Sequence, residues 1–110
     1  MEDWKSRLEA ELERAEAARM RGNEGQARVC ARRAAGIAIR QYLLRRGQPV
    51  RTSSAYDLLN LIAEDPLSTP EVKQAAAHLT LRVNEDFKLP AGVDLLAEAR
   101  QLCARLLSPE

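Results

Sequence analysis

The chain has 110 residues, of which 45% are hydrophobic, 30% are charged and only 4% are aromatic. Enough Leu, Ile, Val and Ala is present to bury one aliphatic core, which excludes a disordered chain and predicts a single domain over residues 1–110. The preference for Ala, Leu, Glu and Arg excludes a β-sandwich, and a net charge of +1 excludes a protein that attracts polyanions by its overall charge.

The spacing of apolar residues predicts a first helix over residues 2–21 and a second over 24–46. Gly22 suits the end of the first helix, Asn23 the N-cap of the second, and Gly47 the end of the second. The second helix is the longest, and it is apolar on more than one side. We therefore expect it at the centre of the fold or shared with a partner chain.

Three shorter helices are predicted over residues 55–63, 70–83 and 95–107. Because short connections favour antiparallel neighbours, the predicted fold is all-α, an up-and-down antiparallel bundle of four main helices plus one short helix. Each of the three starts carries residues suited to an N-cap. These are Ser53 or Ser54, then Ser68 with Glu71 at capping-box spacing, then Asp94.

Cysteine usage and the absence of targeting signals predict the compartment. Cys30 and Cys103 fall on apolar helix positions, which predicts two buried thiols in a reducing cytoplasm, with a disulfide open only if their helices are neighbours. Together with His78, the single histidine, they supply too few ligands for zinc, so no metal site and no cofactor is predicted. Without a signal-peptide h-region or a long apolar run, we expect the cytoplasm of a bacterium or archaeon and no membrane partner.

Positive charge is concentrated in the second predicted helix and the loop after it. Residues 25–56 contain seven arginines and neither an acidic residue nor a lysine, whereas acidic residues outnumber basic ones on both sides of this segment. Guanidinium groups bind phosphates bidentately, which points to an RNA- or nucleotide-binding module. The alternative is that these arginines pair with the glutamates of the first helix. The candidate contacts are Arg28, Arg32, Arg33 and Arg40.

His78 and Arg82 are four residues apart and share one face of the fourth predicted helix. Such a pair would suit a general base beside a cation. The simpler interpretation is a histidine on a helix surface, because the sequence places no nucleophile or orienting carboxylate beside it. No catalytic residue is therefore predicted.

Residues 22–39, GNEGQARVCARRAAGIAI, followed by YLLRRG at 42–47, are similar to the second helix of HEPN domains, the higher eukaryote and prokaryote nucleotide-binding family. In that family an alanine-rich helix ends in a leucine-rich turn and a glycine. Residues 54–59, SAYDLL, resemble the short third helix that follows, without the histidine that many members carry there. The resemblance extends from about Leu8 to Leu107 and rests on pattern and element order.

The resemblance implies a helical bundle that commonly dimerises and that, in many members, accompanies a minimal nucleotidyltransferase in a toxin–antitoxin pair. Many members are metal-independent ribonucleases, whose motif is an arginine followed after four to six residues by a histidine. Arg82 and Asn84 match the start of that motif, but Phe87 stands in place of the histidine, so no base titrates near neutrality there.

Three hypotheses about function follow. The first is a non-catalytic HEPN-like domain that forms a homodimer or binds a partner protein, such as a nucleotidyltransferase. The second is an RNA- or nucleotide-binding module that uses the arginines of the second helix. The third is a divergent ribonuclease that uses His78 and Arg82.

Overall fold

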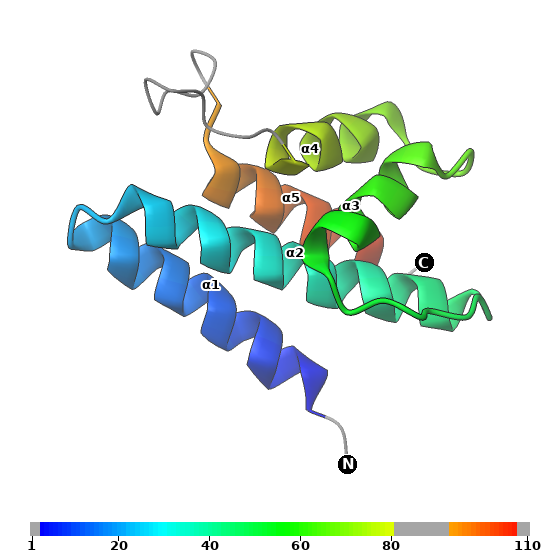
Figure 1. The fold of residues 1–110 in the computed structure, drawn as a ribbon, viewed down its shortest axis with the longest axis horizontal. Coiled ribbons are helices and arrows are strands. Elements are labelled where there is room, and N and C mark those ends of the chain that lie inside the picture. The colour runs from blue at the N-terminus through cyan, green and yellow to red at the C-terminus, as the bar shows by residue number, and fades with distance from the viewer. Residues whose placement is uncertain (1–2, 81–92, 108–110) are drawn as a thin grey trace.

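Five α-helices account for most of the residues that the computed structural model describes, which are 3–80 and 93–107. Neighbouring helices pack antiparallel (Figure 1), so the predicted all-α class is confirmed. The predicted bounds agree with the observed ones within a few residues, and the predicted end of the fourth helix at residue 83 lies outside the described residues. The helices are α1 (Trp4–Met20), α2 (Glu24–Arg45), α3 (Ala55–Glu64), α4 (Pro70–Thr80) and α5 (Leu95–Leu107).

Side-chain caps start most of these helices where the sequence predicts them. Asn23, Ser54 and Asp94 each accept the backbone N–H of the residue three positions ahead. The predicted capping box at Ser68 is wrong, because Thr69 Oγ1 accepts the equivalent N–H and the Ser68 hydroxyl donates to a carbonyl of α3 instead. A proline occupies the first position of α4, and this makes the residue directly before it the N-cap.

Glycines in the left-handed region end the two longest helices. Gly22 follows α1 with φ of +78°, and Gly47 follows α2 with φ of +74°. After α1, the N–H of Gly22 donates to Arg19 O at 2.9 Å and the N–H of Asn23 donates to Ala18 O at 2.8 Å. This pattern satisfies carbonyls that have no partner within the helix, and it reverses the chain so that α2 returns along α1.

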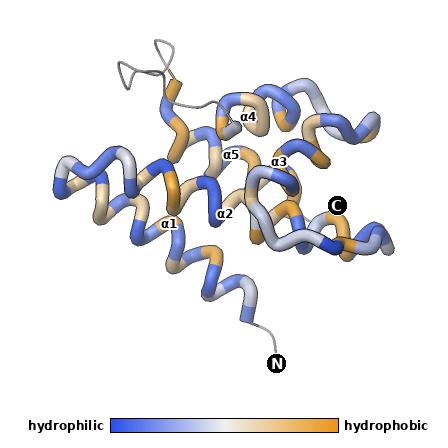
Figure 2. Tube along the Cα trace, in the orientation of Figure 1, coloured by the Kyte–Doolittle hydropathy of each residue, from blue (hydrophilic) through white to orange (hydrophobic). Residues whose placement is uncertain are grey.

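α2 lies at the centre of the fold, between α1 on one side and α3 and α5 on the other (Figure 1). It is unbroken through Gly36, and its second apolar side contributes Ile39 and Leu43 to the core. The two-sided apolar pattern is therefore accounted for largely within one chain. Figure 2 shows hydrophobic and hydrophilic residues alternating along α1 and α2.

The first turn of α3 rests directly on the middle of α2. A Cβ atom placed on Gly36 would lie 3.3 Å from Ala55 Cβ, so the missing side chain is what allows this close approach. The contact fixes the start of α3 beside the α1–α2 pair. None of the described helices is long and apolar enough to cross a membrane.

Arg19 joins three helices at the turn between α1 and α2. Its guanidinium donates to Glu24 at 2.7 Å and to Asp94 at 2.9 Å. The hydrogen bonds to Glu24 and Asp94 raise the pKa of Arg19, and the hydrogen bond from Arg19 lowers the pKa of Asp94. Because Asp94 is also the N-cap of α5, this contact fixes the start of α5 against the α1–α2 turn.

Candidate functional site

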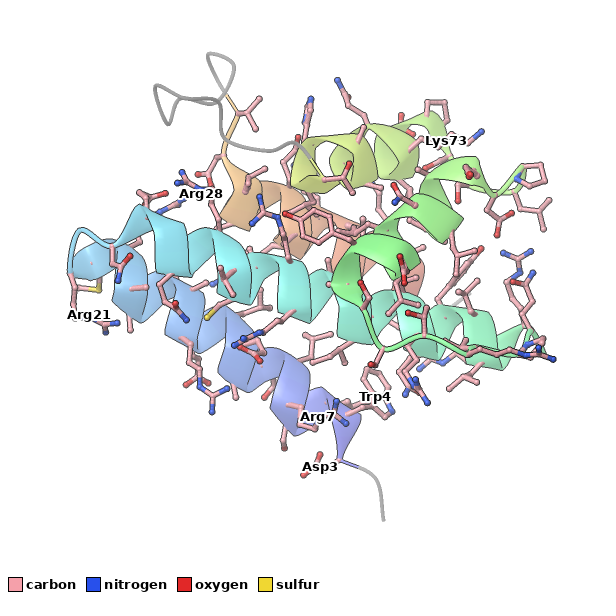
Figure 3. The ribbon with its side chains drawn as sticks, viewed as in Figure 1. Asp3, Trp4, Arg7, Arg21, Arg28 and Lys73 are labelled. Atoms are coloured by element: carbon pink, nitrogen blue, oxygen red, sulfur yellow. The ribbon has the colours of Figure 1, made fainter. Side chains whose placement is uncertain are left out.

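A groove of about 740 Å³ lies between α1, α2 and the start of α3, and its volume is typical of ligand pockets. One face of α1 forms one wall, α2 forms the floor, and residues 53–58 form the other wall. Figure 3 shows Trp4 and Arg7 at the N-terminal end of α1, close to the loop that leads into α3. The lining residues that carry charge or an aromatic ring are Trp4, Arg7, Glu11, Arg32, Arg33, Arg40 and Tyr56.

Two of the predicted phosphate contacts, Arg33 and Arg40, lie exposed on the floor of the groove. They are seven residues apart, which places them two turns apart on one face of α2, about 10 Å along the helix axis. Neither forms an ion pair with a described residue. Their charges are therefore directed into the groove without a carboxylate partner, which is the arrangement a phosphate-bearing ligand needs.

The other two predicted contacts have different surroundings. Arg32 is half-buried and its Nε donates to the carbonyl oxygen of Leu79 at 2.7 Å, so part of its hydrogen-bonding capacity is used within the fold. Its guanidinium also lies 5.4 Å from the centre of the Tyr56 ring. Arg28 lies outside the groove, on the side of α2 that faces the start of α5 (Figure 3). The structure thus brings three of the four arginines together.

Two aromatic side chains mark opposite ends of the groove. Trp4 lies 5.6 Å from the guanidinium of Arg45, in the last turn of α2, whereas Tyr56 lies beside Arg32. The distance between these two arginines along α2 is about 20 Å at 1.5 Å per residue. Tyr56 is 39% exposed. The groove therefore holds Arg33 and Arg40, which form no ion pair with a described residue, between two rings on which bases could stack.

For Arg28, Arg33 and Arg40, pairing with glutamates of α1 is not what the described residues form. The ion pair that joins α1 to α2 has the opposite arrangement of charge. Its cation, Arg19, belongs to α1, and its carboxylate, Glu24, belongs to α2. Within ranges 3–80 and 93–107, no α1 carboxylate forms an ion pair with Arg28, Arg33 or Arg40. Among the described residues, the charges of Arg28, Arg33 and Arg40 are therefore not neutralised by α1.

Sequence reasoning missed the wall that α1 contributes. Trp4, Arg7 and Glu11 recur at a spacing of three and four residues, which is the signal of one helix face. That spacing alone does not tell whether the face borders a core or a groove. The Glu11 side chain is only 13% exposed, and its nearest cation is Arg14, at 3.6 Å.

His78 lies outside the groove and contacts Glu98 of α5 through its Nδ1 atom. Glu98 is a carboxylate partner of His78 that sequence reasoning missed, because nothing in the spacing tells which residues of α4 and α5 face each other. Arg82 and Asn84, the residues that match the family motif, lie outside the described residues. The ribonuclease hypothesis stays a prediction.

The two cysteines are buried and unbridged, as predicted. Cys30 belongs to α2 and Cys103 to α5, and burial raises the pKa of the Cys103 thiol to about 12. Over residues 3–80 and 93–107, no group of three or more His, Cys, Asp or Glu side chains is placed to hold a metal ion. The geometry therefore offers a binding groove, and the described residues beside it form no nucleophile–base pair.

Comparison with models of protein families, with curated proteins and with solved structures gives no match to this chain. The resemblance to HEPN domains therefore rests on the residues themselves and is a proposal about family. What is established is a small all-α domain with a basic, aromatic-edged groove.

Proposed function

We propose that this domain binds single-stranded RNA in the groove, with phosphates on Arg33 and Arg40 and bases stacked on Trp4 and Tyr56. The observation that carries the proposal is the pair of exposed guanidinium groups, without ion-pair partners among the described residues, between two aromatic side chains. Proteins that hold single strands commonly combine a basic groove along the backbone with aromatic stacking platforms.

The length of the groove favours a strand over a free nucleotide. The residues of α2 that line the groove run from Val29 to Leu44, about 22 Å at 1.5 Å per residue, which exceeds the size of one nucleotide. A strand of several nucleotides engages both rings and both phosphate contacts together. A mononucleotide engages one ring, so it should bind much more weakly than a strand of the same base.

Fluorescence anisotropy with a labelled single-stranded RNA of seven uridines tests this function. Two phosphate contacts predict that affinity falls about sevenfold between 50 and 200 mM salt. Trp4 is the single tryptophan of the chain, so its emission should be quenched as the RNA binds. The same assay is repeated with uridine monophosphate as a competitor. Equal affinity for the monophosphate and the strand would show that the ligand is a free nucleotide and not RNA.

Matched variants distinguish binding in the groove from general electrostatic attraction of RNA to the protein. Replacing Arg33 and Arg40 together by Ala should weaken binding and remove most of its salt dependence. The control replaces Arg21 and Arg105 by Ala, since both are exposed and lie outside the groove. Equal losses in the two double variants, or no binding by the wild type at 50 mM salt, would refute the proposal.

A second candidate function, homodimerisation or binding of a partner protein, is favoured by a separate apolar surface. Leu61 and Leu67 are 51% and 69% exposed and line a hollow of about 420 Å³ at the C-terminal end of α3. Exposed apolar patches of this kind are typical of protein interfaces. The HEPN resemblance supports the same function, because many members dimerise or accompany a nucleotidyltransferase.

Light scattering coupled to size-exclusion chromatography tests the second candidate. We expect a dimer at high protein concentration, and replacement of Leu61 and Leu67 by Lys should return it to a monomer without changing RNA affinity. Met20→Lys is the control, since Met20 is 86% exposed at the far end of the fold. A wild-type monomer at every concentration would remove homodimerisation and leave co-purification with a nucleotidyltransferase as the remaining test of a partner protein.

A further inference from the structure

Glu11 is the one acidic residue that lines the groove, and its carboxylate lacks a hydrogen-bond donor. Its side chain is 13% exposed, and the Oε1 atom is shielded from water and accepts no hydrogen bond. The nearest cation, Arg14, is 3.6 Å away and its own side chain is 66% exposed. A shielded carboxylate oxygen without a donor is uncommon in proteins and calls for an explanation.

The position of Glu11 indicates which part of a nucleotide it would meet. It follows Trp4 on the same face of α1, two turns further along the helix, about 10 Å away along the axis. The phosphate contacts, Arg33 and Arg40, project from α2 instead. A carboxylate repels phosphates, so a strand that places its phosphates on α2 turns its bases toward Glu11.

A carboxylate accepts hydrogen bonds and donates none, and it offers two oxygens side by side. Guanine is the base whose Watson–Crick edge carries two adjacent donors, N1–H and the exocyclic N2–H. Adenine and cytosine place a ring acceptor beside their single amino group, and uracil flanks its N3–H with two carbonyl oxygens. Only guanine therefore matches both oxygens of one carboxylate without bringing an acceptor against it.

We propose that Glu11 makes the groove selective for guanine, by accepting the N1–H and N2–H of one unpaired base. The base recognition rests on the proposed RNA-binding function and adds a preference to it. Because Oε1 is shielded in the free protein, this contact requires the Glu11 side chain to rotate toward the base, and the bound guanine then supplies the donors that Oε1 lacks. Recognition of this edge is available only in a single strand.

Anisotropy with labelled heptamers tests the preference, using UUUGUUU, UUUAUUU, UUUUUUU and a heptamer with central inosine, which lacks the N2 amino group. The wild type should bind the guanine strand about tenfold more tightly than the adenine or uridine strand, with inosine between them. Glu11→Gln should lose this preference, because the amide presents one donor and one acceptor. Its affinity for UUUUUUU should rise slightly, because a negative charge near the strand is removed.

Glu13→Gln is the matched control, because Glu13 is an exposed neighbour on α1 that does not line the groove. It removes the same charge and should keep the guanine preference. Thermal unfolding checks folding, and Glu11→Gln should unfold at the same temperature as the wild type or higher, whereas a structural role for Glu11 would lower it.

The outcomes distinguish the two proposals. Binding of all heptamers with equal affinity, or a guanine preference that survives in Glu11→Gln, overturns base recognition and leaves RNA binding in place. Absence of binding to every heptamer overturns RNA binding and base recognition together.

Discussion

The Nε atom of Arg32 donates a hydrogen bond to the carbonyl oxygen of Leu79 at 2.7 Å, which ties the middle of α2 to the last turn of α4. A guanidinium that donates to a backbone carbonyl forms a charge-assisted hydrogen bond, which is stronger than a neutral one. The same guanidinium lies against the Tyr56 ring. Arg32 therefore connects α2, α3 and α4, and it positions one edge of the groove.

Replacing Arg32 should destabilise the fold, whereas replacing its neighbour Arg33 should not. Arg32→Ala removes a charge-assisted hydrogen bond to the backbone and should lower the free energy of unfolding by about 1.5–3 kcal/mol. Arg33 is exposed and has no ion-pair partner among the described residues. Arg33→Ala should therefore change the free energy of unfolding by less than about 0.5 kcal/mol. Urea unfolding followed by circular dichroism measures both. Equal effects in the two variants would show that the Leu79 contact contributes nothing to stability.

A larger side chain at Gly36 should separate α3 from α2. A Cβ there already meets Ala55 Cβ at 3.3 Å and Leu58 Cδ1 at 3.7 Å, so Gly36→Leu must push the first turn of α3 away. The expected loss of unfolding free energy is about 1–3 kcal/mol, the usual effect of overpacking. The matched control is Gly25→Leu, in the first turn of the same helix, where a Cβ meets only Asn23 Oδ1 at 3.8 Å.

Gly25→Leu should be neutral or should stabilise α2 by up to about 1 kcal/mol, since leucine favours helix more than glycine does. Chemical unfolding of the two variants under the same conditions gives the comparison. If Gly36→Leu is as stable as Gly25→Leu, the close approach of α2 and α3 is not required by the fold.

The helices could be predicted because their limits depend on interactions within a few residues. Asn23 and Asp94 cap helices wherever their side chains meet an N–H three positions ahead, and Gly47 ends α2 through a conformation that glycine favours. The central position of α2 followed from its two apolar sides. Ser68 shows the limit of such signals, since Thr69 is equally suited and one residue closer to α4.

The groove could be predicted only in part, because it depends on contacts between residues far apart in the chain. Charge distribution along the sequence indicated Arg33 and Arg40. It could not indicate the partner of Arg32, since that partner is a backbone carbonyl and every residue has one. Nothing in the spacing of α1 or α3 showed that Trp4 and Tyr56 border the same hollow, which arises from how α3 rests on Gly36.

Both cysteine thiols should be unreactive until the protein unfolds. Burial raises the pKa of Cys103 to about 12, so almost no thiolate is present at pH 8, and Cys30 is fully buried. The thiolate is the reactive form, so a thiol-specific reagent should label neither residue in the folded protein and both in concentrated denaturant. Ala104→Cys, an exposed neighbour of Cys103, should add one thiol that reacts at once. Wild-type labelling as fast as that of the added thiol would contradict the burial of these cysteines.

Stability should fall in acid because two carboxylates have pKa values below the ordinary 3.8. For Asp94, the hydrogen bond from Arg19 outweighs the opposing effect of burial. For Asp65, burial alone would raise the pKa, but hydrogen bonds from the Leu67 N–H and from Arg46 outweigh it. A carboxylate whose pKa is lower in the folded state contributes its stability above about pH 3.8, and this is lost as pH falls through the folded value.

Asp94→Asn isolates the contribution of the Arg19 ion pair, because asparagine still caps α5 but carries no charge. At pH 7 the variant should be less stable than the wild type by up to about 1 kcal/mol, the usual size for a partly exposed pair. The difference should shrink toward zero as pH falls below about 4, since protonation then removes the same charge from the wild type. Urea unfolding at pH 7, 5 and 3 measures it, with Glu9→Gln as a control for an exposed carboxylate on α1. A difference that stays constant from pH 7 to pH 3 would mean that the Arg19–Asp94 pair does not govern acid sensitivity.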